Sequence, residues 1–122
     1  MSAQFDKVHA TTVIATAAIT AYRFVSYGGA HTATLPTTGP GDSQGIAEES
    51  AAIGEAVSVV TGYSYLVEAS AAISAGAYVK PAADGSGKAV TGSLTDHCAR
   101  ALGAATAAGQ LVEVQITEHV HA

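Results

Sequence analysis

Residues 53–90 read IGEAVSVVTGYSYLVEASAAISAGAYVKPAADGSGKAV, and the order of strand and turn residues in this stretch decides the fold. Small and apolar residues alternate along 54–60, and the aromatic and apolar residues from 63 to 67 repeat at every second position, which is the period of a half-buried strand. Gly62 lies between the two runs and permits a bulge or a tight bend. The stretch therefore predicts consecutive short strands.

The second part of the same stretch predicts a hairpin. Ala77–Lys80 is a short strand candidate that follows Gly76, a residue able to take positive φ, and Pro81 ends it because proline cannot donate to a sheet. Asp84–Gly87 has the composition of a loose hairpin turn, and Lys88–Val90 leaves it as the returning strand. None of these residues forms a chemical motif, so the stretch indicates an architecture before it indicates a function.

The remaining segments favour the same architecture. Residues 11–20 mix helix-favouring and strand-favouring types and are expected to be mostly extended. Tyr22–Tyr27 is a strand candidate that two glycines end, and Gly45–Ala47 is a shorter extended piece. Leu111–Ile116 alternates cleanly, so its second, fourth and sixth residues should face the core. Residues 97–109 are compatible with either short helix or strand.

We expect one mostly β domain, a small β-barrel or β-sandwich of short antiparallel strands, similar to a β-clip or β-tulip. A length of 122 residues fits a single domain. Residues 1–10 are expected to form an extended N-terminal arm, 11–117 the β domain and 118–122 a C-terminal tail. His31–Asp42 holds two prolines and two glycines, which predicts a long irregular loop.

Two segments of the chain are similar to each other. Residues 18–25 (AITAYRFV) match 72–79 (AISAGAYV), and 107–112 is a weaker third version. Each places small residues before a strand that contains an aromatic residue or leucine and then valine. The similarity indicates one local device, a tight entry into a strand, used two or three times, unless it is a chance match in an alanine-rich chain.

The composition favours a protein that lies against other protein. Hydrophobic residues make up 48% of the chain, but many are alanines, and tryptophan is absent. Small side chains bury little area each, so the core is thin, and association with further copies or a larger partner would add stability. Charged residues make up only 12%, against about 25% in typical soluble domains. Such a surface fits poorly with a freely diffusing enzyme.

Charge and cysteine content exclude several classes of function. The net charge is −5, and the five basic residues are scattered, which argues against nucleic-acid binding. Thr12–Ala21 is too short and too rich in threonine to span a membrane, and it lacks the features of a signal peptide. A single cysteine, Cys98, excludes an internal disulfide and is compatible with a reducing compartment.

Few residues suggest chemistry. Asp96, His97 and Cys98 are adjacent, but catalytic groups converge in space and neighbouring side chains diverge, so Cys98 is expected to be a small buried residue. The acidic residues Glu48, Glu49 and Glu55 are expected to be a solvated cluster. No motif for a phosphate, a dinucleotide or a metalloprotease zinc site occurs. We therefore predict no catalytic residue and no cofactor.

His119 and His121 are weak candidates for a metal site. If the last strand continues this far, both side chains point to one side, and copies from three subunits near a threefold axis could share an ion. No further ligand pair in the sequence supports such a site, so a solvated tail is the favoured interpretation.

A series of weak motifs follows a fixed order along the chain. They are Gly45-Ile46-Ala47, Gly54 with Val57 and Val59, Gly62, Ile73-Ser74-Ala75-Gly76 with Val79, Asp84-Gly85, Ala99-Arg100-Ala101-Leu102, and Gly109 with Val112 and Val114. In this order and spacing, the chain resembles the small capsid cement, or head decoration, proteins of tailed bacteriophages over about residues 15–116. The loop 31–42 and the tail 118–122 have no match in that pattern.

The resemblance implies a compact β domain that binds the outer face of the assembled capsid without catalysis. Such proteins often act as trimers at threefold or quasi-threefold positions and pin neighbouring major capsid subunits against the pressure of the DNA. The implied partners are the major capsid protein and further copies of the chain, with neither nucleic acid nor membrane, and the implied location is the virion surface after synthesis in the host cytoplasm. The predicted contact residues are Phe5, Val8, Leu35, Pro36 and Pro40.

The sequence leaves two other functions open. The chain could be a small-ligand-binding β-clip module, for which His31, Arg23 and Glu68 are the plausible polar groups, although such a site needs them to converge in a pocket. It could also be a structural subunit of a phage tail or baseplate, which copy number per particle would distinguish from a cement protein.

Overall fold

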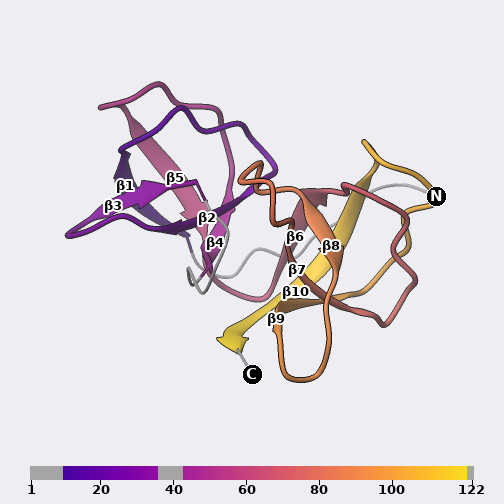
Figure 1. Ribbon diagram of the computed structural model, residues 1–122. Coiled ribbons are helices and arrows are strands. Elements are labelled where there is room, and N and C mark those ends of the chain that lie inside the picture. Colours follow the sequence, from indigo (N-terminus) through magenta and orange to yellow (C-terminus); the bar gives the residue numbers. More distant parts are fainter. Residues whose placement is uncertain (1–9, 36–42, 121–122) are drawn as a thin grey trace.

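The computed structural model describes residues 10–35 and 43–120, which form ten β-strands and no helix (Figure 1). The strands are β1 (Ala10–Ala15), β2 (Phe24–Tyr27), β3 (Thr32–Thr34), β4 (Ser43–Ala47), β5 (Ala56–Val60), β6 (Ser64–Glu68), β7 (Tyr78–Pro81), β8 (Ala89–Thr91), β9 (His97–Ala101) and β10 (Leu111–Val120). The prediction of a mostly β chain is confirmed.

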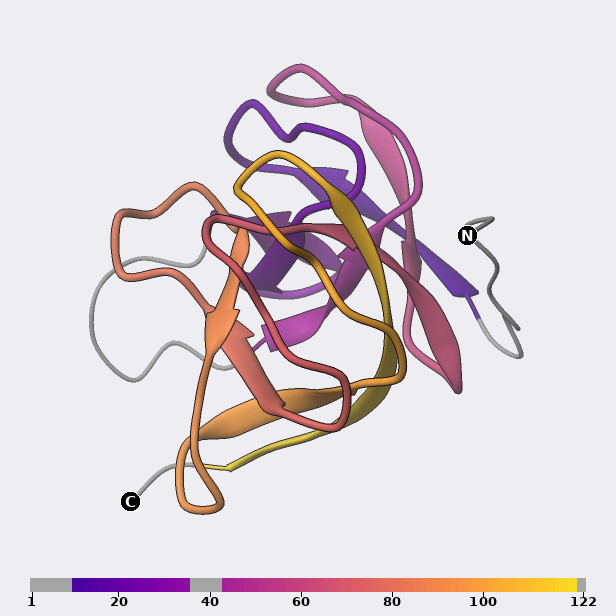
Figure 2. The same ribbon diagram turned by 90° about the vertical axis from the view of Figure 1, so that its right-hand side faces the viewer.

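The strands form two groups of five that lie side by side (Figure 1). The first group closes into a barrel in the order β1-β3-β2-β4-β5, and the second forms a sheet in the order β6-β10-β9-β7-β8. In Figure 2 the second group faces the viewer. Strand pairs are antiparallel as expected, except for the parallel pair β1–β3. We refer to the described part of residues 10–60 as the first half and to residues 64–120 as the second half.

The second half repeats the first about 54 residues further along the chain. β1 pairs with β5 as β6 pairs with β10, and β2 pairs with β4 as β7 pairs with β9. Backbone pairs outside the strands repeat in the same way: Ile19–Ala51 matches Ile73–Ala105, Tyr22–Ala47 matches Gly76–Ala101, and Arg23–Ala47 matches Ala77–Ala101. The similarity of residues 18–25 to 72–79 is therefore part of a duplication that extends through the fold.

Each half has its own small core, and the two cores have the same residue types at matching positions. A buried cluster of nine residues fills the first barrel, and all nine have an identical counterpart in the second half. The matched pairs are Val13 and Val67, Ala15 and Ala69, Ile19 and Ile73, Val25 and Val79, Ala33 and Ala89, Ala47 and Ala101, Ala51 and Ala105, Val57 and Val112, and Val59 and Val114. Four of the nine positions are alanine and four are valine, because five strands this close together leave little room for larger side chains.

A third set of buried residues joins the halves. Phe24, Ile46 and Val60 lie next to each other across β2, β4 and β5. Because side chains alternate along a strand, these three point out of the first barrel while their neighbours point into it. They belong to the buried cluster of the second half and are at most 1% exposed. The outer surface of the first barrel thus completes the core of the second half.

Main-chain hydrogen bonds also hold the two halves together at this contact, which we call the joint. The Glu68 N–H donates to the Tyr22 carbonyl and the Phe24 N–H to the Gly87 carbonyl, each at 2.8 Å. Residues 22–24 therefore lie between β6 and the start of β8. At the equivalent place in the first half, the Ile14 N–H donates directly to the His31 carbonyl at 2.9 Å. The first half is a closed barrel because this bond is direct. In the second half residues 22–24 are inserted between the two equivalent partners, Glu68 and Gly87, so the barrel stays open.

Several segments differ from the expectations. The predicted irregular loop 31–42 contains strand β3. Three residues suffice to close the barrel, but they are too few to show an alternation signal in the sequence. Residues 36–42 lie outside the described part. Residues 97–101 are strand, and β10 continues to Val120, into the segment expected as a tail. Pro81 is the last residue of β7 rather than the first residue after it.

Two strand predictions are confirmed in detail. β7 and β8 form the expected hairpin around residues 84–87, with Lys80 opposite Val90. In β10, Val112 and Val114 are buried and Ile116 packs against the same core cluster, as the alternation predicted.

Candidate functional site

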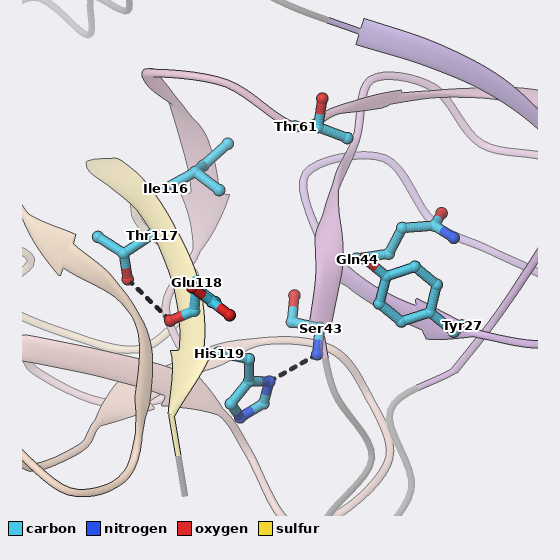
Figure 3. A pocket seen from close by; sticks show the side chains of 8 residues that line it. All are labelled: Tyr27, Ser43, Gln44, Thr61, Ile116, Thr117, Glu118 and His119. Carbon is cyan, nitrogen blue, oxygen red and sulfur yellow. Dashed lines mark hydrogen bonds between the residues drawn. The ribbon is translucent and has the colours of Figure 1, made fainter.

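An open groove of about 380 Å³ lies where the two halves meet (Figure 3). One side of the groove comes from the end of β2 and the start of β4, and the other side comes from the second part of β10. The lining residues are Tyr27, Ser43, Gln44, Thr61, Ile116, Thr117, Glu118 and His119. The groove is therefore mostly polar, and it belongs to both halves.

His119 holds the two sides of this groove together. Its Nδ1 atom accepts a hydrogen bond from the Ser43 N–H at 2.6 Å (Figure 3). A neutral imidazole that accepts at Nδ1 carries its proton on Nε2, so neither nitrogen then offers a lone pair to a metal ion. Residues 10–35 and 43–120 hold no group of three or more potential metal-ligating side chains. His121 lies outside the described residues.

Asp96, His97 and Cys98 diverge, as expected for adjacent residues. Asp96 accepts a hydrogen bond from the Lys80 ammonium at 2.9 Å, and the His97 ring lies 4.6 Å from that of Tyr78. Cys98 is 2% exposed, and burial raises the pKa of its thiol to about 12. The thiol is therefore protonated at neutral pH, and the prediction that Cys98 is a small buried residue is confirmed.

Three side chains stack at the surface of the second half. The Arg100 guanidinium lies 4.3 Å from the centre of the Tyr78 ring, which the His97 ring also contacts. The Arg100 Nε–H donates to the Gly76 carbonyl at 2.7 Å, which fixes the direction of the side chain. The strand pattern alone did not predict this group. The similarity of residues 18–25 to 72–79 could have indicated it, since that alignment puts Tyr78 at the position of Phe24, which is buried.

Two of the polar residues proposed for a ligand pocket come together, but they do so within the joint. Arg23 Nε donates to Glu68 Oε1 at 3.1 Å, and an Arg23 terminal nitrogen donates to the Ser86 carbonyl at the same distance. Lys88 lies 3.5 Å from the second oxygen of Glu68. His31 is exposed on the first barrel and contributes its backbone carbonyl to β1. These groups bind each other across the halves rather than converging on a ligand.

The acidic residues are used locally. Glu48 accepts a hydrogen bond from the Ser58 hydroxyl at 2.5 Å, and Glu55 accepts one from the Ala52 N–H at 2.7 Å. Of the predicted contact residues, Leu35 is half-buried directly after β3. Phe5, Val8, Pro36 and Pro40 lie outside the described residues.

Comparisons with known proteins identify the family. A family model for phage cement proteins matches residues 3–116. The chain belongs to the phage cement protein family. The resemblance found in the sequence is thereby confirmed, and this cement protein is a structural protein of the phage capsid. A search of curated proteins finds no match.

A solved structure shows the same fold as this cement protein. It is the N base of the head fiber gp8.5 of bacteriophage phi29, with a TM-score of 0.65 and 20% sequence identity. The match covers 93% of the present chain and 98% of that chain. In residues 10–35 and 43–120, the structure has no helix of the length and apolarity needed to cross a membrane.

Proposed function

We propose that the chain binds the outer surface of the mature phage capsid as a homotrimer and stabilises the capsid by bridging major capsid protein subunits. The observation that carries this proposal is the match to the cement family over residues 3–116. The likeness to a phage head fiber base supports it at the level of the fold.

The physical properties of the chain support a binding role. Few charges have to lose their hydration when such a surface is covered, because charged residues make up only 12% of the chain. Binding through three linked subunits multiplies a modest affinity for each site. We further propose that the protein has no catalytic activity, which fits the protonated, buried thiol of Cys98 and the local pairing of the carboxylates.

The contact residues are proposed to lie in the N-terminal arm and the 31–42 segment. These residues are Phe5, Val8, Leu35, Pro36 and Pro40. Removing residues 1–9 should weaken capsid binding, while the midpoint of chemical unfolding should change little because both cores lie within residues 13–114. Unchanged capsid binding by the shortened protein would exclude the arm as a contact.

The direct test is to add the purified protein to mature, undecorated capsids of the same virus and to separate them on a density gradient. We expect the protein to band with the capsids at a saturating ratio set by the lattice, and the decorated shells to survive greater heat or chelator concentration. Protein that stays at the top of the gradient would exclude capsid binding. In that case a copy number of a few per virion would favour a tail or baseplate subunit.

A further inference from the structure

The duplication shows that the surface by which the first half binds the second is present twice in each chain. In the first half, Phe24 pairs with Ile46 and Ile46 with Val60 across three strands. At the same register in the second half, Tyr78 pairs with Arg100 and Arg100 with Gln115. We call the first set the buried row and the second set the surface row. The buried row fills the joint, whereas the surface row has no further half to cover it.

The positions that receive the buried row also have counterparts in the first half. In the second half it includes Tyr65, whose ring stacks on that of Tyr22 at 5.9 Å, and Glu68 and Gly87, which make the main-chain bonds of the joint. The register places Thr11, Ile14 and His31 at the equivalent positions of the first half. All three are exposed, and Ile14 is 42% exposed.

The two surfaces use different residues, so the halves pack head to tail rather than about a twofold axis. A contact of this kind uses up one surface of each half and leaves the complementary one free. The free surfaces of a single chain are therefore the surface row on the second half and the receiving residues Thr11, Ile14 and His31 on the first. A second copy of the chain carries the complement of each.

The side chains of the surface row suit an interface that forms after folding. The buried row is phenylalanine, isoleucine and valine, which would be costly to leave in water, whereas the surface row is tyrosine, arginine and glutamine. Tyrosine and arginine are enriched in interfaces between separately folded proteins and dominate their binding energy. Within the described residues Arg100 makes no ion pair, and its guanidinium lies over the Tyr78 ring.

We propose that the surface row of one copy binds the receiving residues Thr11, Ile14 and His31 of the next copy, so that the chains associate head to tail into a closed ring. This inference rests on the self-association in the proposed function and specifies its geometry. Three chains joined in this way present six similar half-units around one axis. The first barrel is already closed by the Ile14–His31 bond, so the contact between copies is made by side chains and is weaker than the joint within a chain.

Crosslinking tests the head-to-tail pairing directly. Two single variants, Ile14→Cys and Arg100→Cys, are mixed and treated with a short bis-maleimide, both at high concentration in solution and on saturated capsids. The native Cys98 does not compete because it is buried and protonated. We expect a covalent dimer from the mixture and much less from either variant alone. A dimer from Arg100→Cys alone, or none from the mixture in both settings, would overturn the proposal.

A matched pair of charge changes separates this interface from the capsid interface. Arg100→Gln and Ala108→Glu each lower the net charge by one, and Ala108 is an exposed residue of the β9–β10 loop. We expect Arg100→Gln to weaken self-association at least tenfold by sedimentation, with Ala108→Glu unchanged and both variants still banding with capsids at high protein concentration. If Arg100→Gln abolishes capsid banding but leaves self-association intact, the row is a capsid contact and the proposed ring is wrong.

Discussion

The duplication provides a stability experiment with its own internal control. Phe24 and Tyr78 occupy the same position in the two halves, but Phe24 is 1% exposed in the joint, whereas Tyr78 is half-buried at the surface. Burial of a phenylalanine side chain removes about 150–200 Å² from water. At about 25 cal/mol per Å² this area is worth about 4–5 kcal/mol, of which an alanine keeps a part. With the cavity that it leaves included, Phe24→Ala should cost about 3–5 kcal/mol.

Tyr78→Ala should cost much less. The change removes a side chain that is only half-buried, together with its contact with Arg100, which is worth about 1 kcal/mol at an exposed site. We therefore expect a difference of at least about 2 kcal/mol between the two variants. A domain of this size is stable by about 5–15 kcal/mol, so Phe24→Ala should still fold but with little reserve.

The assay is urea unfolding followed by far-UV circular dichroism and by tyrosine fluorescence, since the chain has no tryptophan. Protein concentration is kept low enough for the chain to be monomeric, so that an effect of Tyr78 on association does not enter. With an m-value of about 1–3 kcal/mol per molar urea, Phe24→Ala should lower the midpoint by about 2 M. Equal midpoints for the two variants would refute the claim that the first barrel completes the core of the second half.

Three further predictions can be checked in the same assay. Burial raises the thiol pKa of Cys98 from 9.0 to about 12. This thiol should therefore leave the free energy of unfolding unchanged below pH 9 and lower it as the pH rises toward 12. Cys98→Ala should reduce that loss of stability at alkaline pH. Gly45→Ala places a Cβ 2.2 Å from a carbonyl oxygen of β5 and should cost about 3 kcal/mol or more, whereas Gly54→Ala, at φ 87° with open space around it, should cost about 1 kcal/mol. Arg23→Ala should cost about 1–2 kcal/mol at low salt and less at high salt, while Glu68→Gln, which keeps one hydrogen-bond acceptor, should cost less than Arg23→Ala.

Strand identity was predictable from the sequence wherever a strand has a buried and an exposed face. Leu111–Ile116 and the 77–90 hairpin are the best examples, because alternation and turn residues agree there. β3 was not predictable, since three residues carry no periodicity and its position is fixed by the pairing with β1 and β2. β9 remained ambiguous because its sequence, HCARA, lacks β-branched residues and becomes a strand only by lying between β7 and β10.

The joint between the halves was harder to predict than the halves themselves. Alternation in Ala56–Val60 indicates two faces, but it does not reveal that the outer face carries a second core. The pairing of Arg23 with Glu68 joins residues far apart in the chain, so it depends on how the two halves pack. The repeated segment 18–25 was the one available signal. Extending it through all nine core positions required the register of the strands.

The insertion of residues 22–24 between β6 and β8 has a consequence for how the chain folds during synthesis. The first barrel closes with its own residues and emerges from the ribosome first, so it can form before the second half exists. The second half has no such independence, because Glu68 and Gly87 find their main-chain partners on the finished first barrel. We therefore expect the order of translation to be also the order of assembly, with the newly folded first half acting as an intramolecular template for its own repeat.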